Sequence, residues 1–97
     1  MSVTVLMDFT GKPEVVQTMK TAMAASLATT RAYDGCEGVL VNEEIGNANR
    51  IVMVEQWASK EHHEKYLAWR TETGFVGTMM EFVIGPPVIT YLNDTGF

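Results

Sequence analysis

The order of strand-like and helix-like apolar patterns along the chain constrains its fold more than any other feature. Strands place apolar residues at every second position, whereas amphipathic helices place them three or four residues apart. The patterns run as strand, helix, strand, strand, helix and strand over residues 3–9, 15–33, 39–45, 50–57, 59–84 and 88–92. This order predicts an α+β protein with a ferredoxin-like β-α-β-β-α-β arrangement, an antiparallel sheet with helices on one face.

Turn and capping residues mark where these elements end. Residues 46–49 (Gly-Asn-Ala-Asn) form a compact turn signal between two strand patterns, which predicts a β-hairpin. Ser59 is the expected N-cap of the second helical region. That region breaks near Gly74, so residues 75–84 are expected to form a helix of their own, which residues 85–87 (Gly-Pro-Pro) stop.

The sheet is expected to carry more apolar surface than one small chain can cover. A length of 97 residues predicts one domain over residues 1–97 with a modest core. Apolar residues occur in both phases of the strand patterns, so the sheet face without helices is apolar too. Such a face needs a partner, and a second copy of the chain is the simplest one. We therefore expect a homodimer through the sheet face.

Charge and composition exclude several classes of function. The chain has 7 Lys and Arg residues against 12 Asp and Glu residues, a net charge of −5, and no basic stripe. Binding to nucleic acid or to an anionic membrane surface is therefore not expected. No apolar run approaches the ~20 residues of a membrane helix, and the N-terminal residues lack the pattern of a signal peptide. A single cysteine, Cys36, fits a reducing compartment, and we expect a cytoplasmic protein.

The helix expected over residues 59–73 carries polar groups where an apolar stripe would be usual. His63, Tyr66 and Arg70 are about one helical turn apart, on the face that also holds Leu67. A titratable ring, a phenol and a guanidinium at this spacing predict a pocket rather than plain packing. His63 is either a general base or proton shuttle, since its ordinary pKa of ~6.5 is near neutrality, or a core-edge histidine bonded to backbone.

Tyr66 and Arg70 also have two interpretations each. Tyr66 either contacts the same small ligand as His63 or packs as an amphipathic core residue. Arg70 either stabilises an enolate or phenolate, or forms a structural ion pair with Glu55 or Glu81. The sequence leaves both pairs of alternatives open.

Large apolar side chains give a second indication of a cavity. Trp57 and Trp69 either pack in the core or act as platforms for a flat ligand. Methionine fills irregular space and adapts to varied ligands. Four methionines lie on the helical layers expected over the sheet, namely Met19, Met23, Met79 and Met80. They predict either a cavity for a flat or flexible apolar molecule between sheet and helices, or a loosely optimised core.

No metal site is expected from the spacing of the possible ligands. His62 and His63 are adjacent and point about 100° apart on a helix, so they do not share a metal ion readily. No His or Cys follows either of them at three or four positions, and Cys36 is remote. A Gly-rich phosphate loop and a Ser-His-Asp order with a nucleophile elbow are also missing from the sequence.

Taken together, the motifs resemble those of the antibiotic biosynthesis monooxygenase-like family of small dimeric α+β barrel proteins. The resemblance covers nearly the whole chain. It rests on Asp34-Gly35-Cys36, Val54-Glu55-Gln56-Trp57, Ser59-Lys60-Glu61, His63-x-x-Tyr66-Leu67, Trp69-Arg70 with Gly74, and Gly85-Pro86-Pro87-Val88. It implies a homodimer whose two sheets pack into a shared barrel, with a pocket in each subunit between sheet and helices.

The resemblance also implies an activity. Characterised relatives oxidise polycyclic phenols with molecular oxygen and need no flavin or metal, because a deprotonated, electron-rich phenol passes an electron to oxygen directly. We therefore expect a cofactor-independent monooxygenase acting on an aromatic or phenolic, polyketide- or quinol-like small molecule. His63 would be the base, and Tyr66 and Arg70 would hold the oxyanion. The substrate would contact Trp57, Trp69, Met19, Met23, Phe75 and Met79.

Haem degradation and ligand binding without chemistry are the alternatives to a monooxygenase. A second branch of relatives degrades haem with an Asn on the first strand, a Trp on this helix and a His beyond it that ligates iron. Here Asp8, Tyr66 and Val76 lie near these positions, which disfavours haem degradation. The alternative to an enzyme is a dimer that binds a small molecule or fatty acyl chain without chemistry, or a signalling dimer without a ligand.

Overall fold

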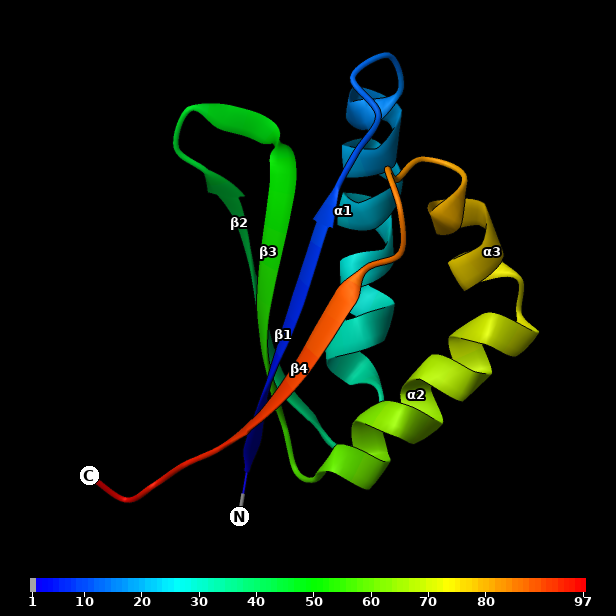
Figure 1. Ribbon diagram of the computed structural model, residues 1–97. Helices are drawn as coiled ribbons and strands as arrows, with labels where there is room; N and C mark the ends of the chain where they lie inside the picture. The colour runs from blue at the N-terminus through cyan, green and yellow to red at the C-terminus, as the bar shows by residue number, and fades with distance from the viewer. Residues whose placement is uncertain (1) are drawn as a thin grey trace.

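The computed structural model describes residues 2–97 as a four-stranded antiparallel sheet with its helices on one side (Figure 1). The strands are β1 (Val3–Thr10), β2 (Cys36–Glu44), β3 (Asn47–Trp57) and β4 (Val88–Asn93). The helices are α1 (Val16–Ala32), α2 (Lys60–Glu72) and α3 (Phe75–Met80). The strand order is β2-β3-β1-β4. The predicted α+β, ferredoxin-like arrangement is confirmed.

The register of the sheet places four side chains in one row under the helices. Val5 on the central strand β1 lies opposite Glu55 on β3 and Tyr91 on β4. Val39 on β2 lies opposite Glu55 from the other side. Directly opposed residues of neighbouring strands point to the same face. Because Val5 and Val39 are buried in the core, Glu55 and Tyr91 also face the helices.

The core fills the space between the sheet and the helices. One cluster of buried residues packs α1 on the sheet and consists of Phe9, Met19, Met23, Val39, Ile51, Met53 and Val83. A second cluster lies under α2 and is formed by Val5, Trp57 and Tyr66. Met19 and Trp57 have no exposed surface. Burying an apolar side chain of this size contributes roughly 1.5–3 kcal/mol, so these residues hold the two layers together.

The last helical segment is shorter than its apolar pattern predicts. Residues 75–84 were expected to form one helix, but α3 ends at Met80. The following residues join the end of β1 instead, where the Ile84 amide donates to the Thr10 carbonyl oxygen at 2.8 Å. Val83 pairs with Gly11, and its side chain is buried in the core cluster on α1. The apolar pattern over residues 75–84 therefore identified residues that contact the core, but it did not show that the helix ends at Met80 and that the chain is extended after it.

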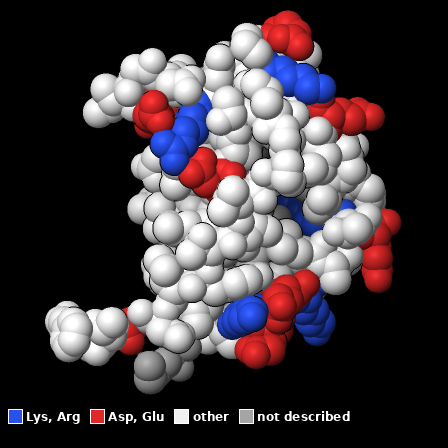
Figure 2. Space-filling model, viewed as in Figure 1, with Lys and Arg blue, Asp and Glu red and all other residues white. Residues whose placement is uncertain are grey.

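The sheet face away from the helices is apolar over much of its area. Leu40, Val88 and Leu92 are 67%, 61% and 41% exposed, and the register puts them on the face opposite to Val5. Figure 2, which shows the sheet and the helical layer side by side as in Figure 1, has a broad uncharged area with charged side chains around it and at a few points within it. None of the helices in residues 2–97 has the length and apolar character needed to cross a membrane.

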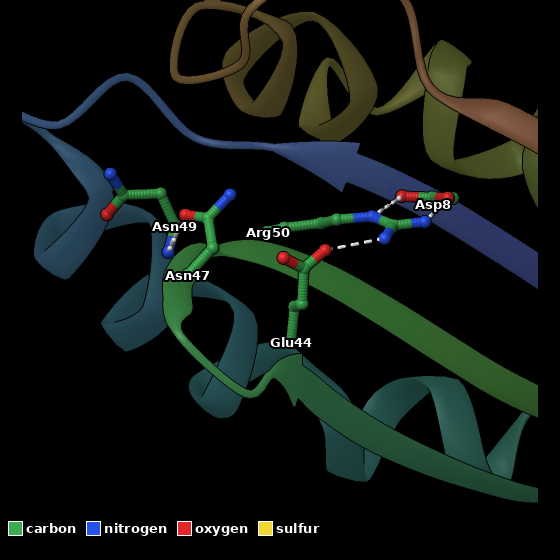
Figure 3. A network of polar contacts seen from close by, with 5 residues as sticks. All are labelled: Asp8, Glu44, Asn47, Asn49 and Arg50. Carbon is green, nitrogen blue, oxygen red and sulfur yellow. Dashed lines mark hydrogen bonds and ion pairs between the residues drawn. The ribbon is translucent and has the colours of Figure 1, made fainter.

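A charged network lies on the helix-free face, close to the β2–β3 hairpin (Figure 3). The Arg50 guanidinium donates from Nε and Nη2 to the two carboxylate oxygens of Asp8, at 3.0 and 2.6 Å. Its Nη1 donates to Oε1 of Glu44 at 2.6 Å. The hydrogen bonds and charge of Arg50 hold the pKa of Asp8 below its ordinary value. Each of these three charged groups is thus ion-paired, with one negative charge in excess.

Candidate functional site

A partly open cavity of about 260 Å³ lies between the sheet and the helical layer. Strands β1, β3 and β4 form one wall, and α1, α2 and α3 form the other. The apolar lining includes Met7, Phe9, Met23, Met53, Phe75 and Met79. The polar residues of the lining are Ser26, Thr30, Glu55, Tyr66, Arg70 and Thr71. An apolar cavity with a few convergent polar groups is the usual form of a small-molecule site.

Tyr66 and Arg70 form a buried polar cluster with the end of α1. They are four residues apart on α2, so they lie one above the other on the same helix face. Arg70 Nε donates to the Tyr66 hydroxyl at 2.8 Å, and Arg70 Nη2 donates to Thr30 Oγ1 at 3.2 Å and to the Ser26 carbonyl oxygen at 3.1 Å. Thr30 and Tyr66 share a further hydrogen bond of 2.7 Å. The guanidinium is therefore fixed at the cavity wall.

Arg70 has no carboxylate partner among residues 2–97. The structural alternative that paired it with Glu55 or Glu81 is wrong, since every hydrogen bond of its guanidinium goes to a neutral oxygen. Its side chain lies over the ring of Phe75, with Cζ 4.3 Å from the ring centroid. Arg70 is only 8% exposed. A buried cation without a counter-ion makes this end of the cavity attractive to an anion.

Glu55 is the second ionisable group of the cavity, and sequence reasoning did not identify it as a site residue. It is 2% exposed, and burial raises the pKa of its carboxyl despite the hydrogen bond that Trp57 Nε1 donates to Oε1 at 2.8 Å. Among residues 2–97, no hydrogen bond is made to Oε2. A signal was present in the sequence, because Glu55 falls in the inward phase of β3 between Met53 and Trp57.

His63 lies behind Glu55 rather than at the cavity wall. It is fully buried, and its Nδ1 is hydrogen-bonded to the Tyr91 hydroxyl at 2.8 Å, not to the backbone. Its Nε2 has no hydrogen bond and is 3.8 Å from Glu55 Oε1. Burial lowers the pKa of His63 to about 4, so the imidazole is neutral near pH 7. A ligand in the cavity meets Glu55 before it can meet His63.

The other predicted site residues divide into two groups. Met23, Phe75 and Met79 line the cavity together with Tyr66 and Arg70. The residues outside the lining are His63, Trp57, Trp69 and Met19. Trp57 has no exposed surface and holds Glu55, and Trp69 stacks on Tyr33 with the ring centroids 5.2 Å apart. Met19 belongs to the core cluster on α1.

The adjacent histidines have separate structural surroundings. Ser59 caps α2 as expected, accepting a hydrogen bond from the His62 amide at 3.2 Å. The Ser59 hydroxyl also contacts His62 Nδ1 at 2.6 Å, so His62 is held at the start of the helix, away from His63 and Glu55. No group of three His, Cys, Asp or Glu residues within residues 2–97 has the arrangement of a metal site.

The fold and the cavity define a small α+β protein with a polar-ended apolar pocket beneath its helices. The sequence matches the model of the antibiotic biosynthesis monooxygenase family over residues 2–75, and the chain belongs to this family. A comparison with curated proteins gave no significant match.

Solved structures share the fold at low sequence identity. A conserved protein from Methanosarcina mazei Go1 superposes with a TM-score of 0.88 at 18% identity, covering 98% of this chain and 94% of its own. Rv0793 from Mycobacterium tuberculosis gives 0.84 at 20% identity, with 97% and 95% covered. An antibiotic biosynthesis monooxygenase of known structure gives 0.86 at 14% identity, with 96% and 98% covered. At these sequence identities, the structural similarity shows a shared fold only.

Proposed function

We propose that this protein is a cofactor-independent monooxygenase that oxidises a small phenol, quinol or anthrone in the cavity. The observation that carries the proposal is the Arg70 guanidinium, which is buried at the cavity wall without a carboxylate partner among residues 2–97. A phenolate or enolate oxygen would supply the missing negative charge. Tyr66, held by Arg70 and Thr30, stands beside the position that this oxygen would take.

The reaction needs only substrate and molecular oxygen. Once ionised, an electron-rich ring passes electrons to oxygen without a cofactor. For an anthrone, two C–H bonds of the methylene break and a C=O bond forms with one oxygen atom, while the other atom leaves as water. The carbon loses the four electrons that the oxygen molecule gains, so no further reductant enters. The protein's part is to take a proton, hold the anion and exclude water.

The size and lining of the cavity limit the substrate. A volume of about 260 Å³ is below the roughly 300–1,000 Å³ of most ligand pockets, so a compact substrate is favoured. Met23 and Met79 would lie against the ring from the helical side, and Met53 from the sheet. Flexible thioether side chains adapt to a flat ring and make favourable contacts with it.

Oxygen uptake tests the proposal directly. Purified protein is incubated with a panel of anthrones and naphthohydroquinones, and oxygen consumption is recorded. Replacing Arg70 by Met removes the cation and keeps most of the length, so kcat/KM should fall by about 10²–10³-fold. Lys65→Met removes an exposed cation from the same helix and should leave the rate unchanged. Equal rates in Arg70→Met and the wild type would contradict the role given to the guanidinium.

A second candidate function is binding of a fatty acyl chain or similar apolar acid without chemistry. The specific observation is that methionine and other apolar side chains dominate the lining while one cation stands at its polar end, which also suits a carboxylate. This function predicts a raised melting temperature with decanoic acid, weaker binding in Arg70→Met, and no oxygen uptake across the panel.

A homodimer is also part of the proposal. The helix-free face exposes Leu40, Val88 and Leu92 around the half-buried Leu6 and Val54. A second copy packed face to face would cover this area and give the two-sheet barrel that the family resemblance implies.

A further inference from the structure

We propose that Glu55 is the residue that takes the proton from the ligand, and that His63 and Tyr91 form a relay carrying this proton from the cavity to the edge strand β4. The inference rests on the proposed function in one respect, namely that the ligand reaches the cavity as an acid. It differs from a direct role of His63 as base, because a carboxylate stands between the imidazole and the cavity.

The position of Glu55 gives the first step of the argument. Glu55 lines the cavity from the sheet, while Arg70 lines it from the helical layer, so a ligand between the layers meets both. Trp57 Nε1 holds Oε1 at 2.8 Å, and no residue described in the structure bonds to Oε2. One carboxylate oxygen is therefore anchored and the other is free to accept a proton from a ligand.

The unpartnered nitrogen of His63 gives the second step. Buried polar atoms in proteins almost always have a hydrogen-bond partner, so an orphaned one needs an explanation. His63 Nε2 is fully buried, has no partner in residues 2–97, and lies 3.8 Å from Glu55 Oε1. For the transfer, the protonated carboxyl group must rotate so that the oxygen carrying the proton takes the place of Oε1 beside Nε2 and donates a hydrogen bond to it.

Tyr91 completes the path. Its hydroxyl is bonded to His63 Nδ1 at 2.8 Å, and its ring is partly exposed on the edge strand β4, with Lys60 Nζ 5.1 Å from the ring centroid. The proton moves from Glu55 to Nε2 as Nδ1 gives its own proton to the Tyr91 oxygen, which passes one to water. Glu55 is then a carboxylate again, and the imidazole carries its proton on Nε2 instead of Nδ1. Rotation of the ring, or return of a proton to Nδ1 and loss of the one on Nε2, restores the starting form.

The surroundings of Glu55 suit a group that alternates between two states. The titratable or charged residues near it or in the same cavity lining are Cys36 on β2, His63, Tyr66 and Arg70 on α2, and Tyr91 on β4. Burial raises the pKa of the Glu55 carboxyl, while the hydrogen bond from the indole of Trp57 favours the carboxylate. The two effects oppose each other, so neither form of Glu55 is held by all of its surroundings.

A phenol that oxygen does not attack separates this inference from the oxidation itself. The probe is 4-nitrophenol, whose phenolate is visible by absorbance. Binding is followed in weakly buffered solution between about pH 5 and 8, and the protons released per bound phenolate are counted. The informative pH range lies above the pKa of Glu55 and below the pKa of free 4-nitrophenol. In this range the wild-type Glu55 keeps the proton that the phenol loses on binding, so almost no proton should be released to the solution.

Glu55→Gln is the decisive variant, because its amide oxygen still accepts from Trp57 while it cannot take a proton. This variant should therefore release about one proton for each phenolate bound. Glu72→Gln, an exposed position on α2, should behave like the wild type. Identical proton counts in Glu55→Gln and the wild type would overturn the assignment, as would a wild type that does not bind the probe.

The relay is tested by how fast the bound probe changes its ionisation, not by the final fraction of phenolate. Tyr91→Phe removes the hydroxyl from His63 Nδ1, and stopped-flow mixing after a pH jump measures how fast the bound probe changes its ionisation. The rate should fall by about tenfold or more while the final phenolate fraction stays the same. A changed final fraction with an unchanged rate would mean that Tyr91 only packs. If proton counts agree but oxygen uptake is absent across the panel, the oxygenase proposal fails and the relay stands.

Discussion

At the scale of single residues, the acidic and the basic residue of the cavity wall are both held in an environment that disfavours a charge. Glu55 faces the neutral imidazole of His63, and Arg70 is surrounded by neutral oxygens. An unpaired buried charge is expensive, and replacement by an apolar residue of similar volume is often neutral or stabilising. These groups are therefore better explained by a charged or acidic ligand than by the stability of the fold.

His63 should make the protein acid-sensitive in a defined window. Burial lowers its pKa from 6.5 to about 4, so between these values the unfolded chain binds a proton that the folded chain does not. Stability supplied by the neutral imidazole is thus complete above pH 6.5 and is lost as the pH falls toward 4, by at most about 3 kcal/mol. Urea unfolding at a series of pH values should show this loss in the wild type relative to His63→Gln.

His62 is the matched control for that measurement, because the chain has only two histidines. His62→Gln leaves His63 in place and should keep the wild-type slope between pH 4 and 6.5. A His63→Gln variant that loses stability in parallel with the wild type over this range would show that the imidazole is protonated in the folded state.

Trp57 should set the ionisation of Glu55. Its indole N–H donates to Oε1, and this hydrogen bond favours the carboxylate against the effect of burial. Trp57→Phe removes the donor, so the pKa of Glu55 should rise further and the proton count with 4-nitrophenol should change at a higher pH than in the wild type. Trp69→Phe, which lies outside the cavity lining, should leave that midpoint unchanged. A midpoint that moves downward in Trp57→Phe would contradict this role.

For α2, the sequence predicted which side chains lie on the buried face of the helix, but not which of them reach the cavity. Helical spacing correctly put His63, Tyr66 and Arg70 on one buried face, but spacing alone does not tell which of them reaches a cavity. That depends on the angle at which α2 crosses the sheet, which no local pattern encodes. Glu55 was missed for a related reason, since a carboxylate in the inward phase of a strand is visible only once the strand's burial is known.

At the scale of elements, patterns of period two and three to four residues were enough for the order and type of the strands and the long helices. They failed after Met80, where an apolar run was compatible with both a helix and an extended segment. The choice was made by long-range pairing with the end of β1. The register that brings Glu55, Val5 and Tyr91 into one row is likewise a property of the assembled sheet.

The turn from α1 into β2 should be intolerant of any side chain. Gly35 has a φ of +89°, and a Cβ there would lie 2.4 Å from the His62 ring at the start of α2. Gly46 in the β2–β3 hairpin has nearly the same φ, +88°, with nothing within 4 Å of a Cβ. Gly46→Ala should therefore cost only the left-handed backbone term of about 1–2 kcal/mol.

Gly35→Ala should cost that amount and a further steric term, because the ring of His62 must move away from Ser59 and from the helix start. Urea unfolding of the two variants gives the difference, which should exceed about 1 kcal/mol. The double variant Gly35→Ala with His62→Ala should recover much of it. Equal losses in the two glycine variants would mean that α2 is not held against this turn.

At the scale of the whole molecule, the apolar helix-free face is the surface on which the proposed dimer depends. Its apolar residues are spread over the strands, while Asp8 and Glu44 are both ion-paired to Arg50 at the hairpin end. Pairing of two such faces would bury apolar area without leaving these charges unpaired. The cavity lies on the other side of the sheet, so a second copy would stiffen its floor without closing it.

Leu40→Glu should convert a dimer into a monomer. Leu40 is 67% exposed on this face, so a carboxylate there is hydrated in the monomer and the fold should survive, whereas in a face-to-face dimer it would be buried. Sedimentation velocity should show twice the chain mass for the wild type and a single chain for Leu40→Glu. Ile84→Glu, at a position 58% exposed beyond the strands, should remain dimeric. A wild type that sediments as one chain at high micromolar concentration would contradict the dimer, and the apolar face would then need another partner.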